Sequence, residues 1–253
     1  NFFIKGLYNS KMPIPLSGTS NHIVVDILKK IGCWDAYNVT EDADLGIRLA
    51  RYKYKILLVN STTLEESPTK LSSWFKQRSR WLKGYMQTYI VHMRRPVELI
   101  NRISFTGFLG FQLFIGLPPL IYIISPILIM LSVVNAYAAG SVIISDFIIS
   151  LMYINLFLNF MLHAIFSYNA NKIEKWHKNH NGIINNDQLE KKLQFFDNFY
   201  LSFLVNKIKI MIIILGYPLY ILLNIISAYK ALWQLFLKPF YWEKTKHGFI
   251  MNE

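Results

Sequence analysis

Three carboxylates fall within four positions of the chain, at Glu41, Asp42 and Asp44. Such a cluster could be the start of a helix, a pair of metal ligands or a catalytic base. The first option needs no special function, because Thr40 is a good N-cap residue and acids in a first turn complement the helix dipole. In the third option, one carboxylate would take a proton from a hydroxyl within hydrogen-bond reach. The cluster alone leaves the three options open.

A second group of chemically useful side chains follows in the sequence W-F-K-Q-R-S-R-W-L-K-G-Y, residues 74–85. Gln77, Arg80 and Trp81 stand at i, i+3 and i+4, so one face of a helix would present an amide, a guanidinium and an indole. Arginine can hold phosphate oxygens through two hydrogen bonds, and an indole offers a flat apolar platform to a sugar ring. The same residues also fit a basic helix at a membrane surface.

The elements that must position these groups follow an α/β pattern over residues 1–95. Hydrophobic periodicity predicts a helix over residues 23–31, with Leu28 and Ile31 directed inward, and a second helix over residues 44–52. A run rich in Ile, Leu and Val predicts a buried strand over residues 54–60. Ser67-Pro68 then opens a longer helix, with serine as N-cap and proline at the first helical position. This helix carries the second group.

The composition favours a membrane protein. The chain has 253 residues, 53% of them hydrophobic, and a formal net charge of +12. Apolar and basic residues together suit a protein whose cationic surfaces face anionic lipid head groups or an anionic substrate. The apolar runs are too long for the core of a soluble nucleic-acid-binding protein. Cys33 is the single cysteine, which excludes an intrachain disulfide and a cysteine metal site.

Three apolar runs follow the first hundred residues. We expect an interfacial helix over residues 96–116 and a spanning helix over 117–134, because the uncharged run exceeds the roughly 20 residues needed to cross a bilayer. The second run covers residues 142–168. The third run, residues 199–237, contains Gly216-Tyr217-Pro218 and fits either one kinked span or a hairpin of two helices, 199–215 and 218–237.

Basic residues predict the orientation of these runs. Lys and Arg concentrate in residues 70–102, in residues 172–192 and in the tail, residues 238–253. By the positive-inside rule all three segments face the cytoplasm. An even number of crossings follows, which favours the hairpin. We therefore expect an all-α integral membrane domain after the α/β part, in a bacterial inner membrane, with the catalytic part in the cytoplasm.

The two groups together resemble a known pair of motifs. Thr40-Glu41-Asp42 matches the T-E-D motif, and Gln77-Arg78-Ser79-Arg80-Trp81 the Q-x-x-R-W motif, of the membrane-embedded, processive members of glycosyltransferase family 2, the cellulose-synthase-like enzymes. Gly18-Thr19-Ser20-Asn21 also resembles the loop before T-E-D in that family. The motifs cover residues 15–95, and the membrane part is similar in layout.

The resemblance implies a GT-A fold and inverting transfer of a sugar from a nucleotide sugar, typically UDP-linked, to a glycan or lipid-linked acceptor. Asp42 would be the general base, and Thr40 and Glu41 would support its loop. Arg80 would help to hold the diphosphate, Trp81 would line the acceptor site, and Gln77 would also bind substrate. The like charges of Glu41 and Asp44 could raise the pKa of Asp42. Membrane lipids are expected partners, and nucleic acid is not.

The resemblance also implies a divalent metal, Mg²⁺ or Mn²⁺, in the complete enzyme. Asp42-Ala43-Asp44 spells D-x-D, but the metal-binding D-x-D of the family precedes T-E-D by many residues, on a nucleotide-binding half that is not found before Pro13. We therefore expect no metal ligands here, a mild effect of Asp44→Asn on transfer, and a chain that is the C-terminal part of a synthase, inactive alone. The alternatives are a lipid-carrier glycosyltransferase with anchoring spans and an inactive membrane remnant.

The tail carries a fainter match. Residues 242–248 can be laid on the F-x-V-T-x-K-G gating-loop motif of bacterial cellulose synthase, with Trp242, Thr245 and His247 in the matching region. A gating loop would close over a bound nucleotide and exclude water. An amphipathic, membrane-proximal tail fits the same residues.

Overall fold

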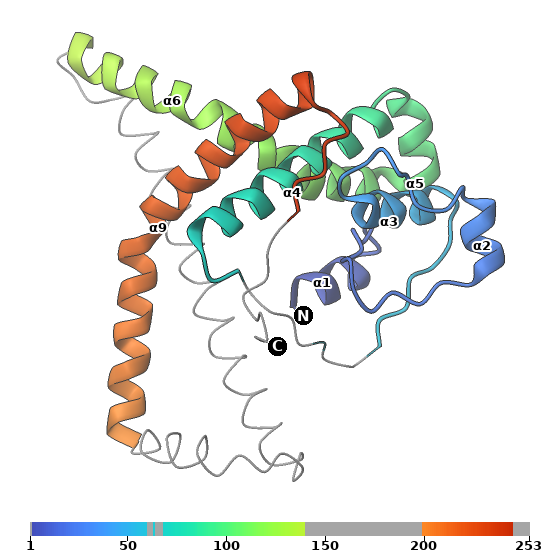
Figure 1. Cartoon of the computed structure of the whole chain (residues 1–253), viewed down its shortest axis with the longest axis horizontal. Helices are drawn as coiled ribbons and strands as arrows, with labels where there is room; N and C mark the ends of the chain where they lie inside the picture. The colour runs from blue at the N-terminus through green and yellow to red at the C-terminus, as the bar shows by residue number, and fades with distance from the viewer. Residues whose placement is uncertain (1, 60–62, 64–67, 140–198, 245–253) are drawn as a thin grey trace, which may run out of the picture. The chain divides into compact units, whose positions relative to one another are not determined.

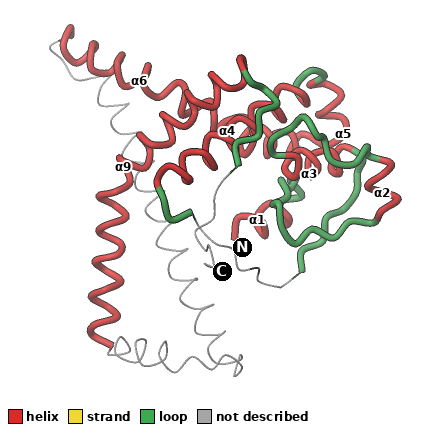
Figure 2. The backbone as a smooth tube through the Cα atoms, in the orientation of Figure 1, coloured by secondary structure: helices red, strands yellow, loops and turns green. Residues whose placement is uncertain are grey.

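The computed structural model describes residues 2–59, 63, 68–139 and 199–244, and these are helices joined by loops (Figures 1 and 2). In chain order the elements are α1 (Phe2–Asn9), α2 (Val25–Lys30), α3 (Glu41–Arg51), α4 (Leu71–His92), α5 (Pro96–Phe111), the π-helix η1 (Gln112–Gly116), α6 (Leu117–Ala139) and α9 (Phe199–Leu237). The chain divides into two compact units, one of Asn1–Ile127 with Leu222–Glu253 and one of Leu128–Ile221. In the second unit, the described residues are the end of α6 and the beginning of α9.

The first unit is built around α3, whose residues from Ala43 to Ile47, together with Leu49, are buried. Ile47 packs with α5 and η1 in one cluster, whereas Leu45 and Leu49 pack with Ile31 in another. Gly46 allows the chain at Ile14 to lie directly against α3, because a Cβ at this position would be 2.2 Å from the Ile14 carbonyl oxygen. Because α3 is buried on both sides, its orientation is fixed. The same burial fixes the position of its first turn, which contains Glu41, Asp42 and Asp44 and is called the acidic turn below.

The long helix α4 packs against the C-terminal part of α9 (Figure 1). Leu82 and Met86 of α4 meet Ala228 and Ala231 of α9, and both alanines are fully buried. Small side chains on α9 let the two helices approach closely. This contact brings the end of α9 beside the part of α4 that carries Gln77, Arg80 and Trp81.

The predicted helices of the first hundred residues form, with different ends. The helix predicted over residues 23–31 is α2, and Ile31 is buried as expected. The helix predicted from Asp44 begins at Glu41, so all three acids lie inside its first turn. The start predicted at Ser67-Pro68 is wrong. Lys70 has an extended backbone with φ −100° and ψ 136°, and α4 begins only after it.

The predicted strand does not form among the described residues. Residues 54–59 contain no strand, and no strand is assigned elsewhere in the described ranges (Figure 2). A strand requires a neighbouring segment that shares its backbone hydrogen bonds. None of the described segments pairs with residues 55–59. The α/β class predicted for residues 1–95 is therefore not seen in this part of the chain, which is helical.

The predicted interfacial helix, residues 96–116, consists of α5 and η1. Pro96 occupies the first turn of α5, and Ser104 interrupts the helix with φ 69° and ψ 166°. The helix then continues without a break into α6, which extends to Ala139 rather than to Val134. The spanning run predicted at 142–168 and the basic connection at 172–192 lie outside the described residues.

The hairpin favoured for residues 199–237 is wrong. α9 is one continuous helix, and Pro218 lies inside it. Proline removes only one backbone donor and its φ is helical, whereas a turn would leave several backbone groups without partners in an apolar environment. Among the described residues, two helical stretches are long and apolar enough to cross a membrane, Pro96–Leu131 and Pro218–Leu237.

Candidate active site

The acidic turn rests directly on α4. Gly84 faces Thr40 so closely that a Cβ on this glycine would lie 2.1 Å from the Thr40 hydroxyl oxygen. Asn38 donates a hydrogen bond from Nδ2 to the Thr88 hydroxyl, one helical turn further along, at 2.9 Å. The Asn38 side chain in turn accepts the Thr40 N–H at 3.0 Å. The loop before α3 is thus held by buried polar contacts to the second half of α4.

Gly84→Ala is expected to disturb the acidic turn, because the new methyl group would overlap three atoms of the short, branched Thr40 side chain. Overpacking of this kind costs about 1–3 kcal/mol. Thermal unfolding should show lower stability, and sugar transfer should fall with it. Gly6→Ala on α1 is the matched control, since no atom lies within 4 Å of its Cβ position. Equal stability of the two variants would contradict the close packing of Thr40 on Gly84.

Asp42 lies half-buried in the first turn of α3. Its Oδ1 accepts the Ala43 N–H at 2.7 Å, and Gly18 lies beside Oδ2, 3.4 Å from the position of a Cβ. Burial raises the pKa of Asp42, and the Glu41 carboxylate raises it further, against the opposing effects of the Ala43 N–H and of Arg80. The predicted rise is therefore present, but burial is its main cause.

Asp44 has a different role from Asp42. Its side chain is 4% exposed, and both of its oxygens have partners: Arg48 Nε lies 2.7 Å from Oδ2 and His92 Nε2 lies 2.9 Å from Oδ1. Arg51 Nη1 lies 3.2 Å from His92 Nδ1, so Nδ1 accepts and the Nε2–H donates to Asp44. Burial acts to raise the pKa of Asp44, but the bonds from His92 and Arg48 outweigh it and hold the pKa below its ordinary value.

The described residues do not fit the divalent metal that the resemblance implies. In Asp42-Ala43-Asp44 the second carboxylate is buried and bound to Arg48 and His92, so the pair cannot chelate a cation. Within the described ranges, no group of three His, Cys, Asp or Glu side chains is placed to hold a metal. Asp42 and Asp44 thus match the D-x-D pattern, but their side chains have different surroundings and do not form a metal site together.

Arg80 projects from α4 toward the acidic turn. Burial lowers its pKa, and the charges of Glu41 and Asp42 oppose that change. On its other side, the guanidinium carbon lies 4.8 Å from the centroid of the Trp242 ring. The buried Arg80 Nε has no hydrogen-bond partner among the described residues. Arg80 thus joins the acidic turn to an aromatic ring and retains an unused donor.

The predicted face of Gln77, Arg80 and Trp81 is only partly formed. Trp81 is 38% exposed and packs against Arg78, whose guanidinium carbon lies 4.9 Å from its ring centroid. Arg78 also lies 5.5 Å from the Trp74 ring. Gln77 is half-buried, one turn before Arg80. The structure places Arg80 within electrostatic range of Glu41 and Asp42, whereas Trp81 packs against Arg78.

The C-terminal segment, residues 238–243, returns from the end of α9 to α4 (Figure 1). Gln87 donates from Nε2 to the Pro239 carbonyl at 3.0 Å, and its Oε1 accepts the Val39 N–H at 3.2 Å. The Phe240 ring packs edge-on against Tyr37, with centroids 5.2 Å apart. Gln87 therefore joins the C-terminal segment to the loop before α3. The other predicted residues of the gating loop, Thr245 and His247, lie outside the described residues.

Several residues of the site were missed by sequence reasoning. Tyr85 lies close enough to Asp42 for that carboxylate to raise the pKa of the phenol, in addition to the larger effect of burial. Tyr85 stands four positions after Trp81, a helical spacing that could have identified it. His92 and the fully buried Lys83 depend on partners far away in the sequence, and no local signal marks them.

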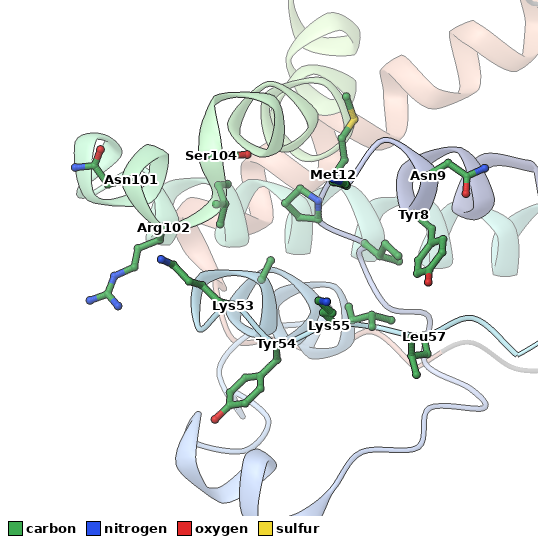
Figure 3. A pocket seen from close by; sticks show the side chains of 16 residues that line it. Tyr8, Asn9, Met12, Lys53, Tyr54, Lys55, Leu57, Asn101, Arg102 and Ser104 are labelled. Atoms are coloured by element: carbon green, nitrogen blue, oxygen red, sulfur yellow. The ribbon is translucent and has the colours of Figure 1, made fainter.

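A hollow of about 840 Å³ lies apart from these residues, between α1, the extended segment after α3 and the first half of α5 (Figure 3). Lys53, Lys55 and Arg102 give it a basic lining, and Tyr8 and Leu57 contribute apolar surface. None of the predicted site residues lines it. Its size alone therefore does not connect it to the chemistry of the acidic turn.

Comparisons with known proteins agree with the motifs. The model of the family described as glycosyl transferase family group 2 matches residues 2–240. The chain is 30% identical over 102 residues to the beta-monoglucosyldiacylglycerol synthase of Synechocystis sp., an alignment that covers 38% of this chain and 21% of that protein. It is 34% identical over 70 residues to the probable glycosyltransferase YdaM of Bacillus subtilis, covering 27% and 17%. The chain thus spans about a fifth of each relative's length. No solved structure matches it significantly.

Proposed function

The chain belongs to glycosyl transferase family group 2, and on this premise we propose that it transfers a sugar, with inversion, from a nucleotide-sugar donor to a growing glycan at the membrane. Glycosyl transfer itself follows from the family. The donor and the acceptor are our proposal. The observation that supports them best is that the half-buried Asp42, whose pKa is raised, lies within electrostatic range of Arg80 on α4.

In this proposal Asp42 is the general base. Its carboxylate accepts the proton of the acceptor hydroxyl while that oxygen forms a bond to the anomeric carbon. The bond from the anomeric carbon to the diphosphate breaks at the same time, and the nucleoside diphosphate leaves with the electron pair. The raised pKa of Asp42 makes it a stronger base than an ordinary carboxylate. The divalent metal implied by the resemblance is proposed to be held by residues of the complete enzyme beyond those described.

Arg80 is proposed to hold the leaving diphosphate. A guanidinium can donate two hydrogen bonds to phosphate oxygens, and its positive charge stabilises the charge that develops on them. The unused Nε donor of Arg80 suits such a contact. Gln77 and Trp81 are proposed to extend this region toward donor and acceptor, and Trp242 with Thr245 and His247 to form the gating loop.

A lipid acceptor is the second candidate, because one relative is named as a synthase of beta-monoglucosyldiacylglycerol. The two apolar helices and the net charge of +12 are consistent with activity at an anionic membrane. We propose that this is the bacterial inner membrane, with the site on the cytoplasmic side.

Membranes that contain the complete enzyme, incubated with labelled nucleotide sugars, distinguish the two candidate acceptors. Label in an extractable glycolipid supports the lipid acceptor, and label in a polymer supports processive synthesis. No incorporation from any donor would support an inactive remnant.

Arg80→Lys is expected to lower kcat/KM for the nucleotide sugar by about 100-fold, because lysine cannot donate the paired hydrogen bonds of a guanidinium. The unfolding temperature should change little, since the positive charge near Glu41 and Asp42 is retained. Arg95→Lys is the matched control: Arg95 is 81% exposed and contacts only Glu98 among the ion pairs of the described residues. An equal loss in both variants, or none in Arg80→Lys, would contradict the assigned role.

A further inference from the structure

We infer that Lys83 is a positioning residue for sugar transfer: it fastens the C-terminal segment to α4 and thereby holds Trp242 against Arg80. The inference rests on the proposed function of Arg80. It adds a residue for which neither the motifs nor the family assignment supplies a role.

Lys83 is a lysine without any exposed surface. Its Nζ donates to the Tyr241 carbonyl at 2.5 Å and lies 3.4 Å from the Lys238 carbonyl. The Lys238 carbonyl directly follows α9, and the Tyr241 carbonyl lies three residues further along the C-terminal segment. The Lys238 carbonyl also accepts the Tyr241 N–H at 3.2 Å. A buried ammonium group is strongly unfavourable unless it is compensated. Here the compensation comes from the backbone of the C-terminal segment and from the charge of Glu243 within it, so the lysine and the segment depend on each other.

Trp242 is held from both sides. The residue before it, Tyr241, is bound through its carbonyl to Lys83. The residue after it, Glu243, accepts hydrogen bonds from Lys230 of α9 at 3.0 and 2.9 Å, with Gln234 at 3.3 Å. The two anchored residues, Tyr241 and Glu243, flank Trp242 and therefore restrict its backbone. Its ring, which is 49% exposed, lies with its centroid 4.8 Å from the Arg80 guanidinium carbon.

Arg80 depends on this ring for its orientation. Lys83 and Arg80 are three positions apart on α4, so the anchor and the arginine share one side of the helix. The stacking contact with Trp242 holds the guanidinium beside the acidic turn, where Nε has no hydrogen-bond partner among the described residues. Loss of Lys83 would release Tyr241, displace Trp242 and free Arg80 to turn away from the donor.

A double-mutant cycle in the complete enzyme tests whether Lys83 acts on Arg80 through Trp242. Lys83→Met and Trp242→Ala are each expected to lower kcat by about 100-fold, with a smaller change in acceptor KM, because misplacement of a group near the chemistry by about 1 Å has effects of this size. If Lys83 acts through Trp242, the double variant should be no slower than the slower single variant. Multiplied losses, or normal kcat in Lys83→Met, would overturn the inference.

Hydrogen–deuterium exchange provides a readout that does not require activity. In purified full-length protein, Lys83→Met should increase exchange in the peptide containing residues 238–243 and leave α3 protected. Lys29→Met, at an exposed position of α2, should not. Glu243→Ala, which removes the acceptor of Lys230 and Gln234 and so the second anchor, should increase exchange in the same peptide and serves if Lys83→Met does not fold. Unchanged exchange in both variants would overturn the inference. If wild-type protein transfers no sugar but Lys83→Met loosens the segment, the proposed function fails and the anchoring stands.

Discussion

Replacing Asp42 with asparagine is expected to abolish sugar transfer by the complete enzyme while leaving its fold and donor binding intact. Asparagine has nearly the same shape and can still accept the Ala43 N–H, but it cannot accept a proton from the acceptor hydroxyl. Loss of a general base lowers rates by about 10²- to 10⁴-fold, equivalent to roughly 3–5 kcal/mol in the activation barrier. This is the largest effect on catalysis that we expect from a single substitution.

The measurement is the initial rate of transfer across a range of pH. Wild-type activity should fall on the acid side as Asp42 becomes protonated, at a pH above that of an ordinary carboxyl group because the pKa of Asp42 is raised. The remaining activity of Asp42→Asn should lack this acid limb. Asp26→Asn is the matched control, since Asp26 is an exposed acid in the first turn of α2. Near-normal turnover in Asp42→Asn would remove Asp42 from the mechanism.

Replacing Asp44 with asparagine is expected to destabilise the protein strongly. The mild effect expected from the sequence followed from placing Asp44 on a helix rather than among metal ligands. The structure shows that its side chain is only 4% exposed and is bound by Arg48 and His92. Removing one partner of a buried ion pair costs about 3–5 kcal/mol, because the remaining charge is left without compensation. Transfer should then fail through unfolding of α3 rather than through loss of a reacting group.

Denaturant unfolding at several pH values measures this contribution. The pKa of Asp44 is lowered in the folded protein, so its stabilising effect is present above the ordinary carboxyl pKa, about 3.9, and is lost as pH falls through the folded value. The stability difference between wild type and Asp44→Asn should therefore be largest near neutral pH and shrink below about pH 4. A stable Asp44→Asn protein that loses cation-dependent donor binding would instead assign Asp44 to a metal site.

Much of the site could be predicted from local sequence. Thr40-Glu41-Asp42 and the helix carrying Arg80 are recognisable because residue types and spacings repeat within a few turns, and the family model confirms the motif-based assignment to glycosyltransferases. Hydrophobic periodicity predicts α2 and α3 because apolar side chains of both helices pack against neighbouring segments. The apolar runs predict α6 and α9 by length alone. These properties belong to short stretches of chain and need no knowledge of distant partners.

The tertiary structure decided what depends on contacts between distant residues. The pKa values of Asp42 and Asp44 shift in opposite directions, because burial dominates at Asp42 whereas Arg48 and His92, the latter 48 positions away, bind Asp44. Lys83 is buried because carbonyls 155 and 158 positions later compensate its charge. The predicted strand lacks a partner in the described part of the chain, and α9 passes through Pro218 without a turn. In each case the outcome depended on burial and hydrogen bonding. The partners in these contacts are brought together by the fold and cannot be identified from neighbouring residues in the sequence.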